Sequence, residues 1–260
     1  MNRSALIVSV TAALSTMGCA PARVPGMARD AYVAPVDVLQ VRWRRHLTED
    51  PLIEYKPQEF ARAATDGKRV FIGSSGGVMF ALDVHDGQKH WDHKLGGAIS
   101  GQPRFVADTG LVYVGCDDGI LYALDAITGE TRWTYKTRGP IASTPVFAND
   151  LLYFTSGENR VYALDARSGK WKWQYDREAP DGFTIRGQGG VLYTKGRIYA
   201  GFADGYLAAL EARTGDIIWV KSLAGDTVSH YVDVDSTPLL EGGVLYASSV
   251  SGGVYALDPK

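Results

Sequence analysis

Several common protein classes are excluded by what this sequence has little of. Its 260 residues include only 2 cysteines, so a framework of several disulfides cannot hold the fold together. The formal charge of −2 leaves no basic excess to neutralise a phosphate backbone, so nucleic acid is not expected as a partner. The apolar run at residues 5–14 is too short for a helix that spans a bilayer.

Glycine and the aromatic residues are, in contrast, abundant. The chain has 30 glycines, 14 tyrosines and 6 tryptophans, and hydrophobic residues make up 45% of it. Glycine-rich turns between strands of aromatic and β-branched residues are typical of all-β proteins. We therefore expect one all-β domain of many short strands, and 260 residues suffice to bury the core of such a domain.

The first residues have the pattern of a secretion signal. Arg3 precedes the apolar run, and Ser15-Thr16-Met17-Gly18 leads to Cys19. This arrangement resembles the lipobox of bacterial lipoproteins, which implies cleavage before Cys19 and lipidation of that residue; simple secretion is the alternative. The resemblance also implies release to the outer membrane, because Ala20 rather than an aspartate follows the cysteine.

These features predict how the chain is divided. We expect a signal peptide at residues 1–18, a flexible tether at residues 19–36 and a propeller domain at residues 37–260. Cys116 is the one cysteine of that domain, so no disulfide within it is expected.

One pattern recurs five times beyond residue 60 and decides the fold. The copy VYVGCDDGILYALDAITGETRW at residues 112–133 contains strands separated by tight turns and ends on tryptophan. The acidic residues of the five copies are spaced 42, 40, 46 and 47 residues apart; they are Asp83, Asp125, Asp165, Glu211 and Asp258. A period of about 40 to 45 residues is typical of propeller blades with four short strands each.

Each part of the repeat has a structural reason. At residues 117–119, Asp-Asp-Gly turns the chain between two strands, since glycine accepts the positive φ that hairpin turns require. Thr128-Gly129 makes the next turn, and Trp133 follows on the outermost strand. The innermost strands begin beside a proline, as at Ser143-Thr144-Pro145, where the missing N–H group costs least.

The pattern A-L-D-x-x-[TS]-G-x-x-x-W resembles the quinoprotein-type (PQQ-like) propeller repeat over residues 38–260. The resemblance implies that one tryptophan of each blade docks against the neighbouring blade; these residues are Trp43, Trp91, Trp133, Trp173 and Trp219. We expect an all-β propeller of about five four-stranded blades. The N-terminal strand at residues 38–43 could complete the last blade. The alternative is an open arc of an eight-bladed propeller.

The quinoprotein resemblance raises the question of a cofactor. For the dehydrogenases it implies calcium-bound PQQ beside an adjacent pair of cysteines, and this chain has no adjacent cysteines, so no cofactor is expected. His90 and His93 lie three residues apart on a strand and point to opposite faces, so no metal site is expected there. The glycine stretches at 73–77 and 187–190 lack the Gly-Lys-[Ser/Thr] ending of a P-loop. We expect no catalytic residues.

Two segments break the repeat, and both fall between successive blades on the same rim. The first contains Phe183, Ile185 and Arg186, and the second contains Asp233 and Asp235. Alternate residues of an extended segment project to one side, so these residues could form an apolar patch flanked by charges that binds a protein. Arg186 could instead pair internally with either aspartate, and the two carboxylates could serve as a calcium or acid–base site.

The lipobox, the propeller repeat and the D-V-D-S-T-P sequence at residues 233–238 together resemble the BamB family of outer-membrane assembly lipoproteins. This resemblance implies that the two segments contact the periplasmic domains of BamA. The residues that match are Phe183, Ile185, Arg186, Asp233 and Asp235, with Phe183 and Ile185 in place of leucines. Three of the expected eight blades have no counterpart in the sequence.

The function that follows from this resemblance is a non-enzymatic scaffold. It would be lipid-anchored at the periplasmic face of the outer membrane, and its partners would be BamA and unfolded outer-membrane proteins. The alternatives are a generic periplasmic propeller that binds a ligand or acts as a sensor through its central channel, and a degenerate PQQ-dependent dehydrogenase.

Overall fold

The structure is a computed structural model that describes residues 40–47, 61–178, 189–224, 232–250 and 253–260. The chain divides into two compact units, Met1–Gln40 and Val41–Lys260, and all strands of the described residues belong to the second unit. No helix within these ranges has the length and apolar character needed to cross a membrane.

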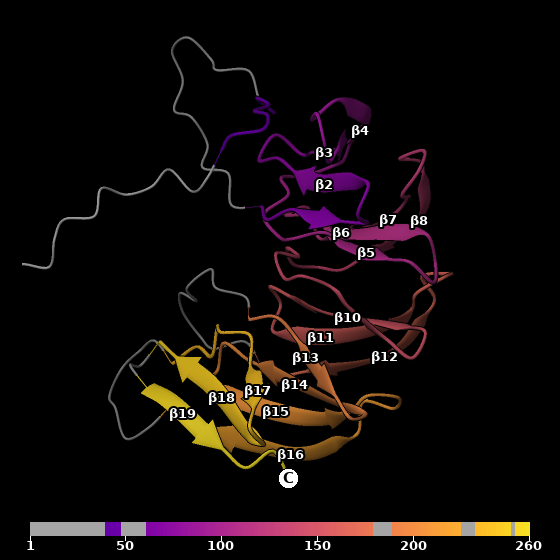
Figure 1. The fold of residues 1–260 in the computed structure, drawn as a ribbon. Coiled ribbons are helices and arrows are strands. Elements are labelled where there is room, and N and C mark those ends of the chain that lie inside the picture. Colours follow the sequence, from indigo (N-terminus) through magenta and orange to yellow (C-terminus); the bar gives the residue numbers. More distant parts are fainter. Residues whose placement is uncertain (1–39, 48–60, 179–188, 225–231, 251–252) are drawn as a thin grey trace, which may run out of the picture. The chain divides into compact units, whose positions relative to one another are not determined.

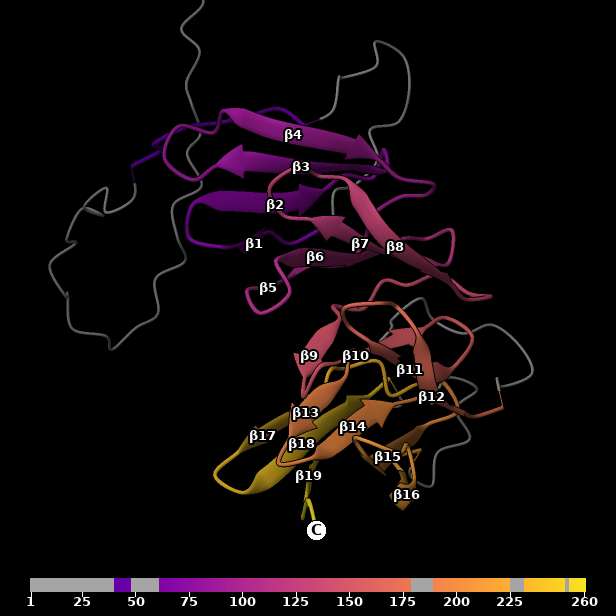
Figure 2. The same ribbon diagram turned by 90° about the vertical axis from the view of Figure 1, so that its right-hand side faces the viewer.

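Five antiparallel sheets follow one another along the chain, and Figures 1 and 2 show them in this order. The first two sheets are formed by β1 (Ala64–Thr65), β2 (Arg69–Gly73), β3 (Val78–Asp83) and β4 (Lys89–Lys94), and by β5 (Arg104–Val106), β6 (Leu111–Gly115), β7 (Ile120–Asp125) and β8 (Thr131–Lys136). The third sheet is formed by β9 (Val146–Ala148), β10 (Leu151–Ser156), β11 (Arg160–Asp165) and β12 (Trp171–Asp176). The last two are formed by β13 (Leu192–Thr194), β14 (Arg197–Gly201), β15 (Tyr206–Glu211) and β16 (Ile217–Ser222), and by β17 (Leu239–Glu241), β18 (Val244–Ser249) and β19 (Gly253–Leu257).

Every sheet has the up-and-down order of a propeller blade, in which each strand pairs with the next one in sequence. We call these sheets blades 1 to 5 in chain order. The expected fold class, an all-β propeller of about five blades, is confirmed. Blades 1 to 4 have four strands each, whereas blade 5 has three strands among the described residues. Residues 40–47 carry no strand, so the described part of the N-terminal segment does not supply a fourth strand to blade 5.

A bulge interrupts the pairing of the two outer strands at the same place in blades 1 to 4. In blade 3 it lies between Ala163 and Leu164, directly after Ala163 has paired with Trp173. Blades 1, 2 and 4 have the same bulge, and in each an alanine lies opposite the tryptophan. The small alanine leaves room for the indole, and the bulge raises the local twist of the outer strand.

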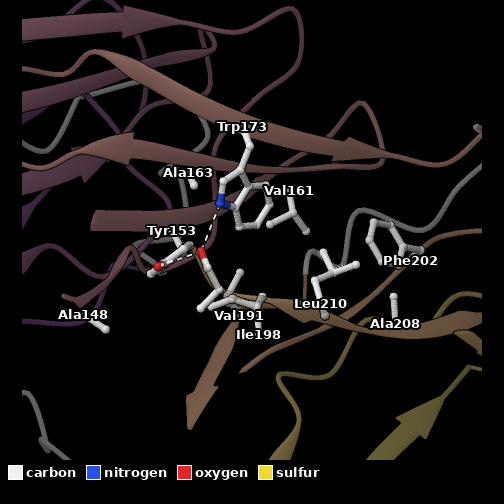
Figure 3. Packing of buried hydrophobic residues seen from close by; sticks show 12 residues of the cluster. Ala148, Tyr153, Val161, Ala163, Trp173, Val191, Ile198, Phe202, Ala208 and Leu210 are labelled. Atoms are coloured by element: carbon white, nitrogen blue, oxygen red, sulfur yellow. Dashed lines mark hydrogen bonds between the residues drawn. The ribbon is translucent and has the colours of Figure 1, made fainter. Parts of the chain in front are cut away.

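The core lies between neighbouring blades. Strand β6 is buried along its whole length, and the side chains of β10, β11, β14 and β15 are largely buried too. One cluster, drawn in Figure 3, joins blades 3 and 4 through Tyr153, Trp173 and Leu210. Similar clusters join blades 1 and 2, blades 2 and 3, and blades 4 and 5. Each blade is therefore stabilised mainly by the apolar surface that it shares with its neighbours.

The tryptophans of the repeat also make a polar contact with the next blade. The indole N–H of Trp173 donates a hydrogen bond of 2.9 Å to the carbonyl oxygen of Ala212, and the Tyr153 hydroxyl donates one of 3.0 Å to the same oxygen. Both dashed lines in Figure 3 end on this oxygen. The equivalent indole bonds elsewhere are Trp43 to Val84 (3.0 Å), Trp91 to Ala126 (3.1 Å) and Trp133 to Ala166 (3.1 Å). Only the indole nitrogen of Trp219 is buried without a hydrogen-bond partner among these five tryptophans in the described ranges.

Candidate functional site

The residues predicted to bind a partner are only partly visible in the structure. Phe183, Ile185 and Arg186 lie outside the described residues, and so does the predicted lipidation site Cys19. Asp233 and Asp235 are described, as are both ends of the segment 179–188. The residues on either side of that segment, 177–178 and 189–190, are called its stems. The site can therefore be described from these stems and from residues 232–237.

Asn159 holds the stem that precedes residue 179. Its side-chain amide donates a hydrogen bond of 3.1 Å to the carbonyl oxygen of Glu178, and its side-chain oxygen accepts one of 2.8 Å from the backbone N–H of Ala203. Asn159 is 8% exposed and has a φ of 62°, a left-handed conformation that asparagine tolerates better than most residues. One side chain thus ties the end of blade 3 to the turn between β14 and β15 in blade 4.

Arg177 makes a second link at the same stem. Its Nε lies 2.5 Å from Oδ2 of Asp204, and its guanidinium lies 4.1 Å from the centroid of the Tyr206 ring. Burial by itself would lower the pKa of Arg177, but hydrogen bonds with Tyr175 and Asp204 outweigh that effect, and the net pKa is raised. The guanidinium therefore stays charged and is held on both a carboxylate and an aromatic face.

The stem that follows residue 188 is held from two sides. The Thr155 hydroxyl donates a hydrogen bond of 2.9 Å to the carbonyl oxygen of Gly189, and the backbone N–H of Gly190 donates one of 2.8 Å to the Thr237 hydroxyl. Thr155 belongs to blade 3 and Thr237 leads into blade 5. Both ends of the segment 179–188 are thus fixed to neighbouring blades.

The second repeat-breaking segment packs beside these stems. The backbone N–H of Val234 donates a hydrogen bond of 3.0 Å to the carbonyl oxygen of Phe202, and that of Val250 donates one of 2.9 Å to the carbonyl oxygen of Asp233. Asp233 is 3% exposed, whereas Asp235 is half-buried. The two aspartates therefore differ in their access to a partner, and Asp235 is the more accessible of the two.

The turn at residues 202–205 joins the two segments. Its Ala203 N–H bonds to Asn159 at the first stem, and its Phe202 carbonyl bonds to Val234 in the second segment. We call this arrangement the blade-4 rim; it comprises residues 177–178, 189–190, 202–206 and 232–237. Sequence reasoning missed Asn159, Arg177 and Asp204. Asn159 stands where other copies of the repeat have a turn glycine, and this departure was the available signal.

The other candidate groups are engaged in structural contacts. His90 lies 3.4 Å from the carboxylate of Asp83, whereas His93 lies 3.2 Å from the hydroxyl of Thr131, so the two imidazoles have different neighbours. No group of three or more metal-binding side chains occurs within the described ranges. Cys116 is fully buried, and burial, followed by the charges of Asp118 and Asp117, raises its pKa to about 12. A buried thiol with a raised pKa is not expected to react in the folded protein.

A family model and individual relatives point to the same protein family. A family model described as "Outer membrane protein assembly factor BamB" matches residues 86–260. A relative of that name from Shewanella oneidensis is 27% identical over 225 residues, which cover 83% of this chain and 46% of the relative. Another from Kangiella koreensis is 39% identical over 79 residues, or 29% of this chain and 20% of the relative. The chain thus spans less than half the length of these curated relatives.

Solved structures show the same fold. BamB from Moraxella catarrhalis superposes with a TM-score of 0.68 at 24% identity, covering 78% of this chain and 62% of that one. A quinohemoprotein alcohol dehydrogenase from Pseudomonas putida superposes with a TM-score of 0.60 at 20% identity, covering 78% and 41%. The fold is therefore common to assembly factors and to enzymes, and it does not by itself decide the function. The family model does decide the family, and the chain belongs to that of the outer membrane protein assembly factor BamB.

Proposed function

We propose that this protein is a non-enzymatic scaffold of the outer-membrane β-barrel assembly machinery, which binds the periplasmic domains of BamA and assists the insertion of outer-membrane proteins. The observation that carries the proposal is the family match over residues 86–260, because this range includes both segments that break the repeat. In this proposal the protein is anchored through a lipid on Cys19 and faces the periplasm.

The geometry of the blade-4 rim supports this role. A protein-binding site gains affinity when its loops are held in place before the partner arrives. Here the stems of the segment 179–188 are fixed at Glu178, Gly189 and Gly190, and the second segment is fixed at Val234. We propose that Phe183 and Ile185 supply the apolar contact and that Arg186 and Asp235 supply the charged flanks.

Asp233 has a different role in this proposal. Because it is 3% exposed, its carboxylate contributes to the shape of the second segment rather than to the contact surface. Replacement of Asp233 is therefore expected to lower stability as well as binding, whereas replacement of the half-buried Asp235 is expected to lower binding alone.

The dehydrogenase alternative is not favoured by the residues present. The two cysteines of the chain are Cys19 and Cys116, which are far apart in sequence, and Cys116 lies in the core between blades 1 and 2. A titration with PQQ and calcium tests this point directly. Binding that stabilises the fold would raise the melting temperature and would contradict the non-enzymatic assignment.

Co-purification of the tagged full-length protein from detergent-solubilised outer membranes tests the main proposal. Wild type is expected to retain BamA, whereas Arg186→Glu and Asp235→Lys are expected to lose it at an unchanged melting temperature. Arg213→Glu is the matched control. Arg213 is exposed in blade 4 and follows the C-terminal end of β15, whereas the turn at residues 202–205 in the blade-4 rim precedes that strand. If the folded wild-type protein retains no BamA, the proposed function is wrong. If Arg186→Glu and Arg213→Glu both retain it, the site is wrong.

A further inference from the structure

A small cavity lies where the innermost strands of all five blades begin. Its volume is about 250 Å³, and each blade supplies part of its wall. The side chains of Arg62, Gln102 and Thr144 come from blades 1, 2 and 3, and Gly190 and Thr237 come from blades 4 and 5. The cavity is smaller than the roughly 300–1,000 Å³ of drug-sized ligand sites, so its size suits one small molecule or one side chain.

Hydrogen bonds between blades hold this wall in place. The Gln102 amide donates a bond of 2.7 Å to the carbonyl oxygen of Ala63, which links blade 2 to blade 1. The Gly190 N–H donates to the Thr237 hydroxyl at 2.8 Å, which links blade 4 to blade 5. A side chain at Gly101 would meet the carbonyl oxygen of Ala142 at 2.6 Å, so glycine there allows blades 2 and 3 to approach. Contacts within the protein therefore hold the wall of the cavity, and no ligand is needed to form it.

The polar groups of the wall favour a negatively charged ligand. Among the described residues of the lining Arg62 is the one that carries a charge, and the nearest carboxylate given for this wall, that of Asp117, is bonded to the Ser100 hydroxyl. Within the described ranges the Arg62 guanidinium and the Thr144 hydroxyl make no hydrogen bond or ion pair, and Arg62 is exposed whereas Thr144 is half-buried. The hydroxyls of Ser100 and Ser143, in contrast, donate to Asp117 and to the Thr155 carbonyl. A guanidinium recognises planar or tetrahedral oxyanions through paired N–H donors.

We propose that this cavity binds a small oxyanion, a carboxylate or a phosphate group, with Arg62 as the cation and Thr144 as a second donor. The proposal does not rest on the proposed BamA contact, because the two residues that it uses as donors, Arg62 and Thr144, are not among those proposed to bind BamA. Its wall nevertheless includes Gly190 and Thr237, which belong to the blade-4 rim. An acidic group presented by a polypeptide on that rim is thus one source of the anion, and a free ion is the other.

Isothermal titration of the full-length protein at constant ionic strength tests the proposal. The probes are inorganic phosphate, acetate and a blocked Gly-Asp-Gly peptide, each compared with an equal ionic strength of sodium chloride. Saturable binding of at least one probe is expected. Arg62→Gln is expected to weaken it by about tenfold or more, since a charge-assisted hydrogen bond is lost. Thr144→Val is expected to weaken it by a smaller factor, because a neutral donor is lost.

Arg104→Gln is the matched control. Arg104 is exposed on the innermost strand of blade 2 but does not line the cavity, so this variant should bind as wild type does. Both arginine variants should melt at the wild-type temperature. Binding of phosphate but not of the peptide would assign the site to a free anion, and binding of acetate and the peptide would assign it to a polypeptide carboxylate. Absence of saturable binding by all three probes, or equal binding by wild type and Arg62→Gln, overturns the proposal.

Discussion

The guanidinium of Arg177 lies over the ring of Tyr206, 4.1 Å from its centroid, while its Nε contacts Asp204 at 2.5 Å. Arg177 stands at the end of blade 3, Asp204 lies in the turn before β15, and Tyr206 is the first residue of β15 in blade 4. A charged group held in this way fixes the last described residues before the segment 179–188. The contact therefore links the stability of two blades to the position of the proposed binding segment.

Arg177→Ala is expected to lower the free energy of unfolding by about 1–3 kcal/mol, because it removes a cation–π contact and leaves the Asp204 carboxylate without its partner. Chemical denaturation followed by tryptophan fluorescence measures the change. Lys89→Ala is the control, since the Lys89 side chain is 45% exposed beside the equally exposed Asp92 and an exposed ion pair contributes little. Equal losses of unfolding free energy in the two variants would show that the Arg177 contact stabilises the fold no more than an exposed ion pair does.

Trp173→Phe is expected to cost about 1 kcal/mol more than Trp219→Phe, because only the first substitution removes a hydrogen bond to the neighbouring blade. Both substitutions remove the same atoms, so their difference reflects the indole N–H together with the deeper burial of Trp173. Parallel denaturant titrations of the two variants give this difference. A larger loss for Trp219→Phe would mean that its indole is hydrogen-bonded in solution.

Gly129→Ala is expected to destabilise the protein more than Gly110→Ala. Both glycines have positive φ, 76° and 71°, which costs an alanine about 1–2 kcal/mol. At Gly129 a Cβ atom would also lie 2.6 Å from the Trp91 ring, whereas nothing lies within 4 Å at Gly110. Overpacking adds about 1–3 kcal/mol to the first substitution. Melting temperatures of the two variants would be alike if the Trp91 ring moved aside freely.

The Asp125 carboxylate should contribute to the pH dependence of stability at acid pH. A hydrogen bond from Arg132, and then one from the Thr128 backbone, lowers the pKa of Asp125 to about 2. A carboxylate whose pKa is lower in the folded state stabilises the protein above the unfolded pKa of about 4, and this contribution is lost as the pH falls towards 2. Asp125→Asn should therefore flatten the dependence of unfolding free energy on pH between these values. An unchanged slope would contradict the assignment.

Cys116 should report on unfolding. Because it is fully buried and its pKa is raised to about 12, its thiol should react with a disulfide reagent only when the surrounding strands open. A Cys19→Ser variant leaves Cys116 as the one thiol of the chain, and its labelling rate should rise with denaturant in parallel with the unfolded fraction. Rapid labelling without denaturant would show that blades 1 and 2 separate locally.

The blades could be predicted from the sequence because their determinants are local. The turn at residues 117–119 and the outermost strand that contains Trp133 depend on neighbouring residues and on the repeat, and both are observed. The contacts of the blade-4 rim depend instead on residues far apart in the chain. Asn159 bonds to Ala203 across 44 residues, and Arg177 bonds to Asp204 across 27. The departure from the repeat marks Asn159 itself, but no local pattern marks its partner or the pair of Arg177 and Asp204, so these contacts became visible only in the structure.

The backbone carbonyl that receives each docking tryptophan has a further consequence. The acceptors belong to Val84, Ala126, Ala166 and Ala212, whose side chains take no part in the bond. This hydrogen bond therefore does not depend on the identity of the acceptor residue, whereas the small side chains of Ala126, Ala166 and Ala212 are buried and are constrained by packing. Because each blade offers the same backbone acceptor to its neighbour, blades are interchangeable in principle. A family built in this way can gain or lose blades by duplication or deletion and still form the same contact between neighbours.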